Sequence, residues 1–251
     1  MNAAPLLRLQ DVTKVFGGIR ALSGISFEVA SGQIVGVIGP NGAGKTSMFN
    51  VITGAYRADS GRVLLAGEDV TNFAPHRIAR AGISRTFQNI RLFGGMTVWE
   101  HLLVAQPHRE SALRRALPTG WADPVALERA REVLDFFALG ETKDRIARSL
   151  PYGLQRRVEM ARAVTAHPKL LLLDEPVAGM NHDEARDIGN LIRRLRDQGF
   201  TILLIEHDMP FVMGLCDYLH VLDFGAMIAQ GRPQDVRTDP AVLDAYLGHA
   251  A

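Results

Sequence analysis

Cysteine and long apolar runs are nearly absent from this sequence. Its 251 residues include one cysteine, Cys216, which excludes an intrachain disulfide and fits a reducing compartment. The neighbours of this cysteine are apolar, so we expect a buried and inert thiol. No segment approaches the ~18 apolar residues that a membrane-spanning helix needs, and the N-terminus lacks the features of a signal peptide. If the protein acts at a membrane, another chain is expected to span it.

An excess of charge of either sign is also missing. Lys and Arg total 28 against 27 Asp and Glu, a formal net charge of +1, so no bulk attraction to nucleic acid or anionic lipid is expected. Hydrophobic residues make up 47% of the chain and charged residues 22%, as in ordinary globular domains. A chain of this length buries a substantial core, as one domain or two small ones.

A glycine-rich segment carries the first chemical signal. Residues 39–46 read Gly-Pro-Asn-Gly-Ala-Gly-Lys-Thr, the pattern of a phosphate-binding loop, between a predicted buried strand at 33–38 and a predicted helix at 45–53. Glycines let backbone amides surround a phosphate, and the helix dipole adds positive potential. We therefore expect a nucleoside triphosphate site, with Lys45 on the β- and γ-phosphates and the Thr46 hydroxyl on Mg²⁺. The expected contacts are Gly39, Pro40, Asn41, Gly42, Ala43, Gly44, Lys45, Thr46 and Ser47.

A second predicted strand ends in two acidic residues. Four leucines at 170–173 precede Asp174 and Glu175, and ligands bind at the carboxyl ends of parallel strands. Asp174 is expected to bind Mg²⁺ directly or through water. Glu175 is placed to orient or deprotonate the water that attacks the γ-phosphorus. Two solvated acids at the end of a strand are the alternative, which the upstream phosphate loop disfavours.

The order of strand and helix patterns predicts an α/β fold. The early part is strand-rich with antiparallel character, 91–166 is mostly helical, and the last third alternates strands and helices, which is typical of a parallel sheet covered on both faces. Strands are expected at 7–12, 25–29, 34–38, 62–65, 170–173 and 201–205, with a hairpin of 219–222 and 227–230. Helices are expected at 96–105, 124–139, 155–167, 183–198, 209–216 and 240–247. One stripe of the helix at 183–198 carries Ile188, Leu191, Ile192 and Leu195.

Five motifs in order resemble an ATPase subunit of an ABC transporter. They are the loop at 39–46, Gln88 in Arg85-Thr86-Phe87-Gln88, the segment 150–157, the strand 170–175 and His207, and together they cover essentially the full chain. The stretches 85–93, 204–209 and 245–248 are similar to the ATP-binding subunits of branched-chain amino-acid importers. The implied fold is a P-loop NTPase with a mostly parallel sheet core, an antiparallel β subdomain and a helical subdomain.

The resemblance also implies roles for single residues. Phe16 matches the aromatic residue that stacks on adenine, and Gln88 matches the glutamine that touches Mg²⁺ and the attacking water. His207 resembles the switch histidine that contacts the γ-phosphate. Gly153 and Leu154 belong to the signature loop, which binds the γ-phosphate held by a second subunit, so that a dimer encloses two ATP molecules.

Two segments depart from the family pattern. In the signature, Pro151 replaces a serine, Tyr152 the first glycine and Leu154 a glutamine. Loss of one charge-assisted hydrogen bond there costs on the order of 1.5–3 kcal/mol, so this half-site is expected to be weak. Asn181 stands where many relatives have aspartate. Glu206 and Asp208, which flank the switch histidine, are expected to be exposed or structural.

The implied function is ATP hydrolysis that drives import of branched-chain or related amino acids. The implied domain is single, with 1–90 and 167–251 as catalytic core and β subdomain and 91–166 as helical subdomain. The expected cofactors are ATP and Mg²⁺. The expected partners are a second ABC ATPase subunit, identical or paralogous, two membrane-spanning permease subunits that meet the surface at 89–97, and indirectly an external solute-binding protein. No nucleic acid is expected, and the location would be the cytoplasmic face of the inner (plasma) membrane, as a peripheral subunit.

Two alternatives remain at the level of sequence. One is an ABC ATPase that serves another process, such as lipid export or nucleic-acid repair, although the long coiled-coil insertion of repair members is absent and the net charge is +1. The other is a P-loop kinase, which has no use for a signature loop. Phosphate release without an acceptor distinguishes an ATPase from a kinase.

Overall fold

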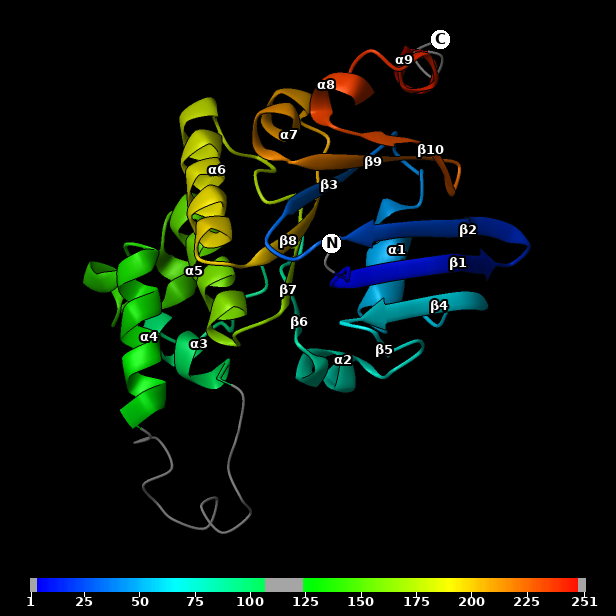
Figure 1. The fold of residues 1–251 in the computed structure, drawn as a ribbon. Coiled ribbons are helices and arrows are strands. Elements are labelled where there is room, and N and C mark those ends of the chain that lie inside the picture. The colour runs from blue at the N-terminus through cyan, green and yellow to red at the C-terminus, as the bar shows by residue number, and fades with distance from the viewer. Residues whose placement is uncertain (1–3, 107–123, 248–251) are drawn as a thin grey trace. The chain divides into compact units, whose positions relative to one another are not determined.

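Two sheets hold the strands of the described residues, 4–106 and 124–247, in the computed structural model (Figure 1). The smaller sheet has the order β2-β1-β4-β5, and all of its pairs are antiparallel. Its strands are β1 (Leu7–Phe16), β2 (Ile19–Val29), β4 (Ser60–Leu65) and β5 (Glu68–Asp69). This sheet confirms the predicted antiparallel part, with β1 and β2 longer than their alternating patterns indicated.

The larger sheet is the mostly parallel core that the sequence predicted. Its order is β10-β9-β3-β8-β7-β6, and every pair is parallel except the hairpin of β9 and β10. The strands are β3 (Ile34–Ile38), β6 (Ile83–Arg85), β7 (Leu170–Asp174), β8 (Thr201–Ile205), β9 (Tyr218–Asp223) and β10 (Ala226–Gly231). The carboxyl ends of β3, β7 and β8 therefore meet at one edge of the sheet.

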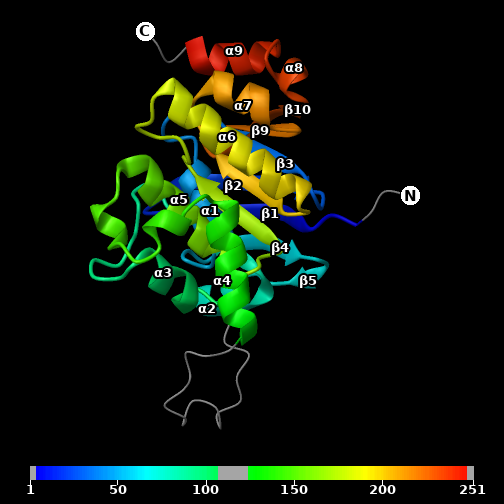
Figure 2. The ribbon, with the colours of Figure 1, turned by 90° about the vertical axis from the view of Figure 1, so that its left-hand side faces the viewer.

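The central strands are apolar except for Thr201 at the start of β8 and Asp174 at the end of β7, because both of their faces are covered. Every residue of β3, β7 and β8 is buried. Val35 and Val37 share one core cluster with α1 (Lys45–Ile52) and with the smaller sheet. Figure 2 shows α6 (His182–Asp197) and α7 (Met209–Leu215) over the other face. On that face a Cβ at Gly36 would lie 2.9 Å from the Sγ atom of Cys216, which is buried as expected.

The described residues divide into two compact units, one within Met1–Arg85 and Lys169–Ala251 and the other within Thr86–Pro168. The first contains both sheets, α1, α6, α7 and three further helices: α2 (Pro75–Ala81), α8 (Pro233–Val236) and α9 (Pro240–Leu247). The second contains α3 (Val98–Val104), α4 (Pro124–Phe136), η2 (Gly140–Thr142), η3 (Ala147–Ser149) and α5 (Tyr152–Thr165). None of these described helices is long and apolar enough to cross a membrane.

Local sequence explains where the principal helices begin and what they bury. The side chain of Asn181 accepts hydrogen bonds from the backbone amides of Asp183 and Glu184, and the Glu184 carboxylate accepts one from the backbone amide of Asn181, which makes a capping box for α6. The predicted stripe of this helix is buried: Ile188, Leu191, Ile192 and Leu195. Thr97 and Glu100 make a second capping box for α3.

Several elements differ from the sequence prediction. α5 begins at Tyr152 rather than near Gln155, so Gly153 lies inside its first turn. The expectation of a helix start at 155 was wrong because Pro151 takes the extended conformation that precedes a helix, with φ −52° and ψ 151°. Six short elements were missed: β5, α2, β6, η2, η3 and α8. The last residue of the stretch 245–248 lies outside the described residues.

Candidate nucleotide-binding and hydrolysis site

The glycine-rich loop at 39–44 connects β3 to α1 and requires glycine at two of its positions. Gly39 has φ 147°, and a Cβ there would lie 2.0 Å from the carbonyl oxygen of Leu222. Gly44 has φ 99°, and its Cβ would lie 2.5 Å from the carbonyl oxygen of Ala21. The loop is thus pressed against backbone on two sides, and only residues without a side chain fit.

Lys45 is the first residue of α1, and its ammonium group is buried against the loop. Nζ donates hydrogen bonds to the carbonyl oxygens of Gly39 (2.6 Å) and Pro40 (2.8 Å). Burial lowers the pKa of this lysine, whereas the negative charges of Glu175 and Asp174 raise it. The side chain of Thr46 is exposed. A cation and a free hydroxyl therefore stand at the helix N-terminus, where a phosphate is favoured.

Asp174 ends β7 at the same edge of the sheet and is nearly buried. Its Oδ2 atom lies 2.6 Å from Nη2 of Arg85. The other terminal nitrogen of this arginine, Nη1, donates to Oδ1 of Asn50 at 2.7 Å. A nearly buried carboxylate is thereby held by a guanidinium group that also binds a second partner.

Glu175 and His207 follow the neighbouring strands β7 and β8. Glu175 has φ 46°, which is uncommon for a residue with a side chain, and its amide donates to the carbonyl oxygen of Ile205 at 2.9 Å. Its Oε2 atom lies 3.6 Å from Nδ1 of His207, whose side chain is 61% exposed. The structure thus brings two of the three predicted catalytic residues, Glu175 and His207, to one place beside Asp174, and strained backbone of this kind clusters at functional sites.

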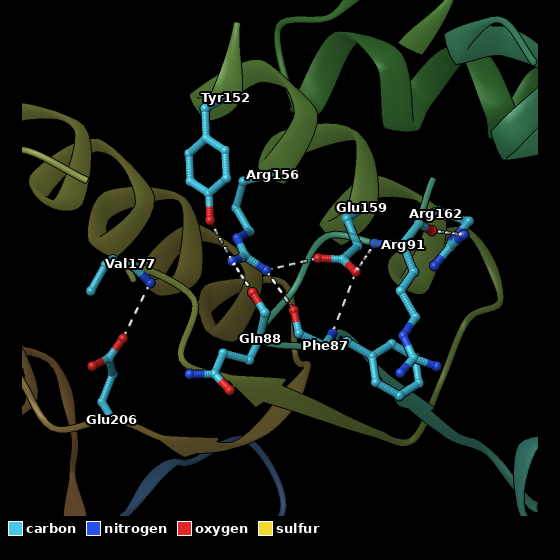
Figure 3. A network of polar contacts seen from close by, with 9 residues as sticks. All are labelled: Phe87, Gln88, Arg91, Tyr152, Arg156, Glu159, Arg162, Val177 and Glu206. Carbon is cyan, nitrogen blue, oxygen red and sulfur yellow. Dashed lines mark hydrogen bonds and ion pairs between the residues drawn. The ribbon is translucent and has the colours of Figure 1, made fainter. Parts of the chain in front are cut away.

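Glu206 is buried, and its carboxylate binds backbone amides of the two loops that follow β7 and β8. It is 1% exposed, and its carboxylate accepts backbone hydrogen bonds from Val177 (3.2 Å), His207 (2.9 Å) and Asp208 (3.3 Å); the first is drawn in Figure 3. Burial raises the pKa of this glutamate, and these amides oppose the shift. Of the two readings, exposed or structural, the structure supports the structural one. Asp208 is structural too, because its side chain accepts from the amide of Phe211 and caps α7.

Phe16 and Asn181 lie on the surface of the same unit. Phe16 ends β1, is 41% exposed and contacts Tyr56 edge to face with ring centroids 5.1 Å apart. Lys14 places its ammonium nitrogen 5.0 Å from the centre of the Phe16 ring. The ring of Phe16 is therefore partly exposed, with Lys14 over one face. The side chain of Asn181 is exposed but already serves as the cap of α6.

Gln88 and the signature segment belong to the other unit, and one buried arginine connects them (Figure 3). Arg156 donates to the carbonyl oxygens of Phe87 (2.7 Å) and Gln88 (2.8 Å). It also contacts Oε2 of Glu159 at 2.8 Å and the hydroxyl oxygen of Tyr152 at 3.2 Å. Both members of the Arg156–Glu159 ion pair are fully buried. The first turn of α5, which contains Gly153 and Leu154, is thus tied to the backbone at Gln88.

Glu159 and Arg162 extend this network along α5. Glu159 accepts hydrogen bonds from the backbone amides of Phe87 (3.4 Å) and Arg91 (3.2 Å), and Arg162 donates to the carbonyl oxygen of Arg91 at 2.7 Å. Burial lowers the pKa of Arg162, whereas the charge of Glu159 raises it. One helix therefore holds the chain from 87 to 91 by three charged side chains.

Comparison with known families decides the assignment. The family model described as ABC transporter matches residues 22–178. The chain belongs to the ABC transporter family. A second model, described as Branched-chain amino acid ATP-binding cassette transporter, matches residues 226–251 of this ABC ATPase. The family assignment decides against the P-loop kinase, because the core of the chain matches a transporter ATPase.

Individual relatives of this ABC ATPase match nearly end to end. The high-affinity branched-chain amino acid transport ATP-binding protein BraF of Pseudomonas aeruginosa is 44% identical, over 98% of this chain and 99% of that protein. The protein LivG of Escherichia coli K12, described in the same words, is 43% identical with the same coverage. Among solved structures, the ADP conformation of MJ1267, an ATP-binding cassette of an ABC transporter, matches with a TM-score of 0.87 and 37% identity, over 98% of this chain and 100% of that one.

Sequence reasoning overlooked two arginines of this ABC ATPase. Arg85 was noted only as the first letter of the motif that contains Gln88, and Arg156 only as part of the signature stretch. No local signal existed for the first, because its strand is recognised only by its pairing with the strand that ends in Asp174. None existed for the second, because an arginine in a polar helix pattern is ordinarily solvated.

Proposed function

We propose that this ABC ATPase hydrolyses ATP to drive import of branched-chain or related amino acids. The observation that carries the amino-acid assignment is the 44% identity to BraF over 98% of the chain. The hydrolytic part is supported by Asp174, Glu175 and His207, which lie at the carboxyl edge of the parallel sheet, and by Lys45, the first residue of α1.

Mg²⁺ is part of the proposal, and the available donors fit it. The exposed Thr46 hydroxyl and the Asp174 carboxylate are hard oxygen ligands, and Mg²⁺ in nucleotide sites takes one or two such groups together with phosphate oxygens. Gln88 would supply a further oxygen. When bound, the metal neutralises charge that develops on the phosphates.

The residues of this chain would then have separate roles in hydrolysis. The glycine-rich loop and Lys45 bind the phosphates. Glu175 accepts a proton from water as the water oxygen attacks the γ-phosphorus, and the bond to the ADP oxygen breaks. His207 donates a hydrogen bond to the γ-phosphate, and Phe16 stacks on adenine. Gly153 and Leu154 at the start of α5 would bind the γ-phosphate held by a second subunit.

The proposed assembly comprises a second ABC ATPase subunit, two permease subunits and, indirectly, a solute-binding protein. The chain would lie as a peripheral subunit on the cytoplasmic face of the inner membrane. The relatives are named as transport ATP-binding proteins, which supports such an assembly. Residues 89–97 would face the permease, and Phe93 within them is 50% exposed.

The hydrolytic assignment is tested with Glu175→Gln. We expect retained ATP binding and turnover reduced by about 10²- to 10⁴-fold, because the proton acceptor is lost. Glu141→Gln, a change at an exposed position of η2, is the matched control and should leave turnover unchanged. Near-normal turnover of the Glu175 variant would exclude this residue as the base.

The substrate assignment needs the whole transporter. The chain, purified with its co-purifying permease subunits and a solute-binding protein, is reconstituted in liposomes, and ATP-dependent uptake of leucine, isoleucine and valine is measured. Uptake that depends on Glu175 supports the proposal. ATP-dependent lipid movement without amino-acid uptake would support the export alternative instead.

A further inference from the structure

One guanidinium group joins two elements of the hydrolysis site. Arg85, the last residue of β6, contacts Asp174 at 2.6 Å through Nη2 and donates to Oδ1 of Asn50 at 2.7 Å through Nη1. The arginine side chain is 9% exposed and that of the aspartate 7%. The guanidinium carbon lies 5.5 Å from the centre of the Phe49 ring, so apolar surface limits its movement.

Of the partners of this arginine, Asn50 lies near one proposed metal ligand and Asp174 is another. Asn50 follows Thr46 by four residues on α1, so both side chains occur on one face of that helix, one turn apart. Asp174 is itself the second proposed ligand. β6 also runs parallel to β7, with Arg85 paired to Leu172, two residues before the aspartate. The arginine thus bridges the helix that carries one ligand and the strand that carries the other.

We propose that Arg85 is a positioning residue for the Mg²⁺ site, an inference that rests on the proposed function. Its planar fork binds Asn50 and Asp174 at once, which sets the distance between α1 and the end of β7. Groups that orient metal ligands in this way typically contribute 10- to 100-fold to metal affinity, roughly.

The test compares two substitutions of the arginine in the purified full chain. Binding of the non-hydrolysable ATP analogue AMP-PNP is measured by calorimetry in EDTA and in saturating MgCl₂. The dissociation constant in EDTA divided by that in MgCl₂ gives the contribution of the metal to binding. For Arg85→Met we expect this ratio to fall about tenfold, with the affinity in EDTA unchanged. Arg85→Lys keeps the charge but offers one nitrogen, so it should lower the ratio about threefold.

The lysine variant separates positioning from simple charge balance. If the arginine only opposed the negative charge of Asp174, lysine would behave as wild type and methionine would strengthen the metal contribution; either result overturns the proposal. Arg80→Met, an exposed change on α2, is the matched control. If Arg85→Met does not fold, the proposal is tested with Asn50→Ala and Arg85→Lys instead. Asn50→Ala removes only the hydrogen bond between Arg85 and α1. Unchanged ratios in both would refute positioning.

The wild-type protein separates this inference from the proposed function. If AMP-PNP binds wild type equally well with and without MgCl₂, the proposed metal site itself fails, whatever the variants do. If wild type shows a metal contribution and both arginine variants retain it, only the role of Arg85 fails.

Discussion

Replacing Arg156 with methionine would leave a buried carboxylate and two backbone carbonyls without their cationic donor. Arg156 and Glu159 are both 0% exposed, and the carbonyls are those of Phe87 and Gln88. Removing one member of a buried ion pair typically costs about 3–5 kcal/mol, because the other charge stays buried and unpaired. We expect a loss of that size in the free energy of unfolding. This is a large share of the roughly 5–15 kcal/mol that stabilises a typical domain.

Urea unfolding followed by tryptophan fluorescence measures this loss in the correct part of the molecule. Trp99 lies in α3, within the unit that contains the network, so its emission follows the unfolding of that unit. Arg131→Met on α4 makes the same chemical change at an exposed position. This control should change stability by less than about 0.5 kcal/mol.

A double variant tests the reasoning behind the magnitude. Arg156→Met with Glu159→Met removes the unpaired charge, so more than half of the lost stability should return. Recovery stays incomplete because the amides of Phe87 and Arg91 lose the carboxylate as acceptor. A single variant that loses less than about 1 kcal/mol would refute the idea that this pair holds the unit together. If the double variant is as unstable as the single one, the lost stability comes from the missing hydrogen bonds to the backbone rather than from the unpaired charge.

Three further predictions concern the unit with the two sheets. Gly39→Ala should abolish ATP binding measured by calorimetry, since its Cβ would lie 2.0 Å from the carbonyl oxygen of Leu222. Asn181→Ala should lower the free energy of unfolding by about 1 kcal/mol through loss of the α6 cap, whereas Asn181→Asp should not. Burial lowers the pKa of His220 to about 4, so its unfolded form, with a pKa near 6.5, binds the proton first. Stability should therefore be complete above that pH and fall by up to about 1.4 kcal/mol per unit toward pH 4, a slope that His220→Leu should flatten in urea titrations.

The parallel core could be predicted because its signals are local. β3, β7 and β8 read as unbroken apolar runs since both faces of each are covered, and this burial leaves little room for other residue types. The phosphate loop is equally local, because glycine is required wherever the backbone passes close to a neighbour. The side chains of Asp174 and Glu175 could be placed at the sheet edge once β7 was recognised.

Short elements and buried charges could not be predicted, because they depend on contacts with residues far away in the sequence. α2 buries a single side chain, that of Ile78, so its sequence shows little periodicity. β6 has three residues and is defined by its pairing with β7 rather than by its own pattern. Arg156 can be buried because the backbone carbonyls of Phe87 and Gln88, far away in the sequence, accept hydrogen bonds from its guanidinium group. No property of its neighbours in sequence indicates these contacts.

The departures in the signature segment do not all weaken it. Pro151 precedes α5 without a side-chain cap, so the hydroxyl of the common family pattern is missing here. Tyr152, in place of a glycine, instead gains a hydrogen bond from Arg156, and Gln155 donates to the carbonyl oxygen of Leu150 at 2.8 Å. The start of α5 is therefore held by hydrogen bonds from the side chains of Arg156 and Gln155. The first backbone amides of a helix have no acceptor inside the helix. Those amides, at Gly153 and its neighbours, would still bind a phosphate, so the deficit of this half-site reduces to one hydroxyl contact rather than a disordered loop.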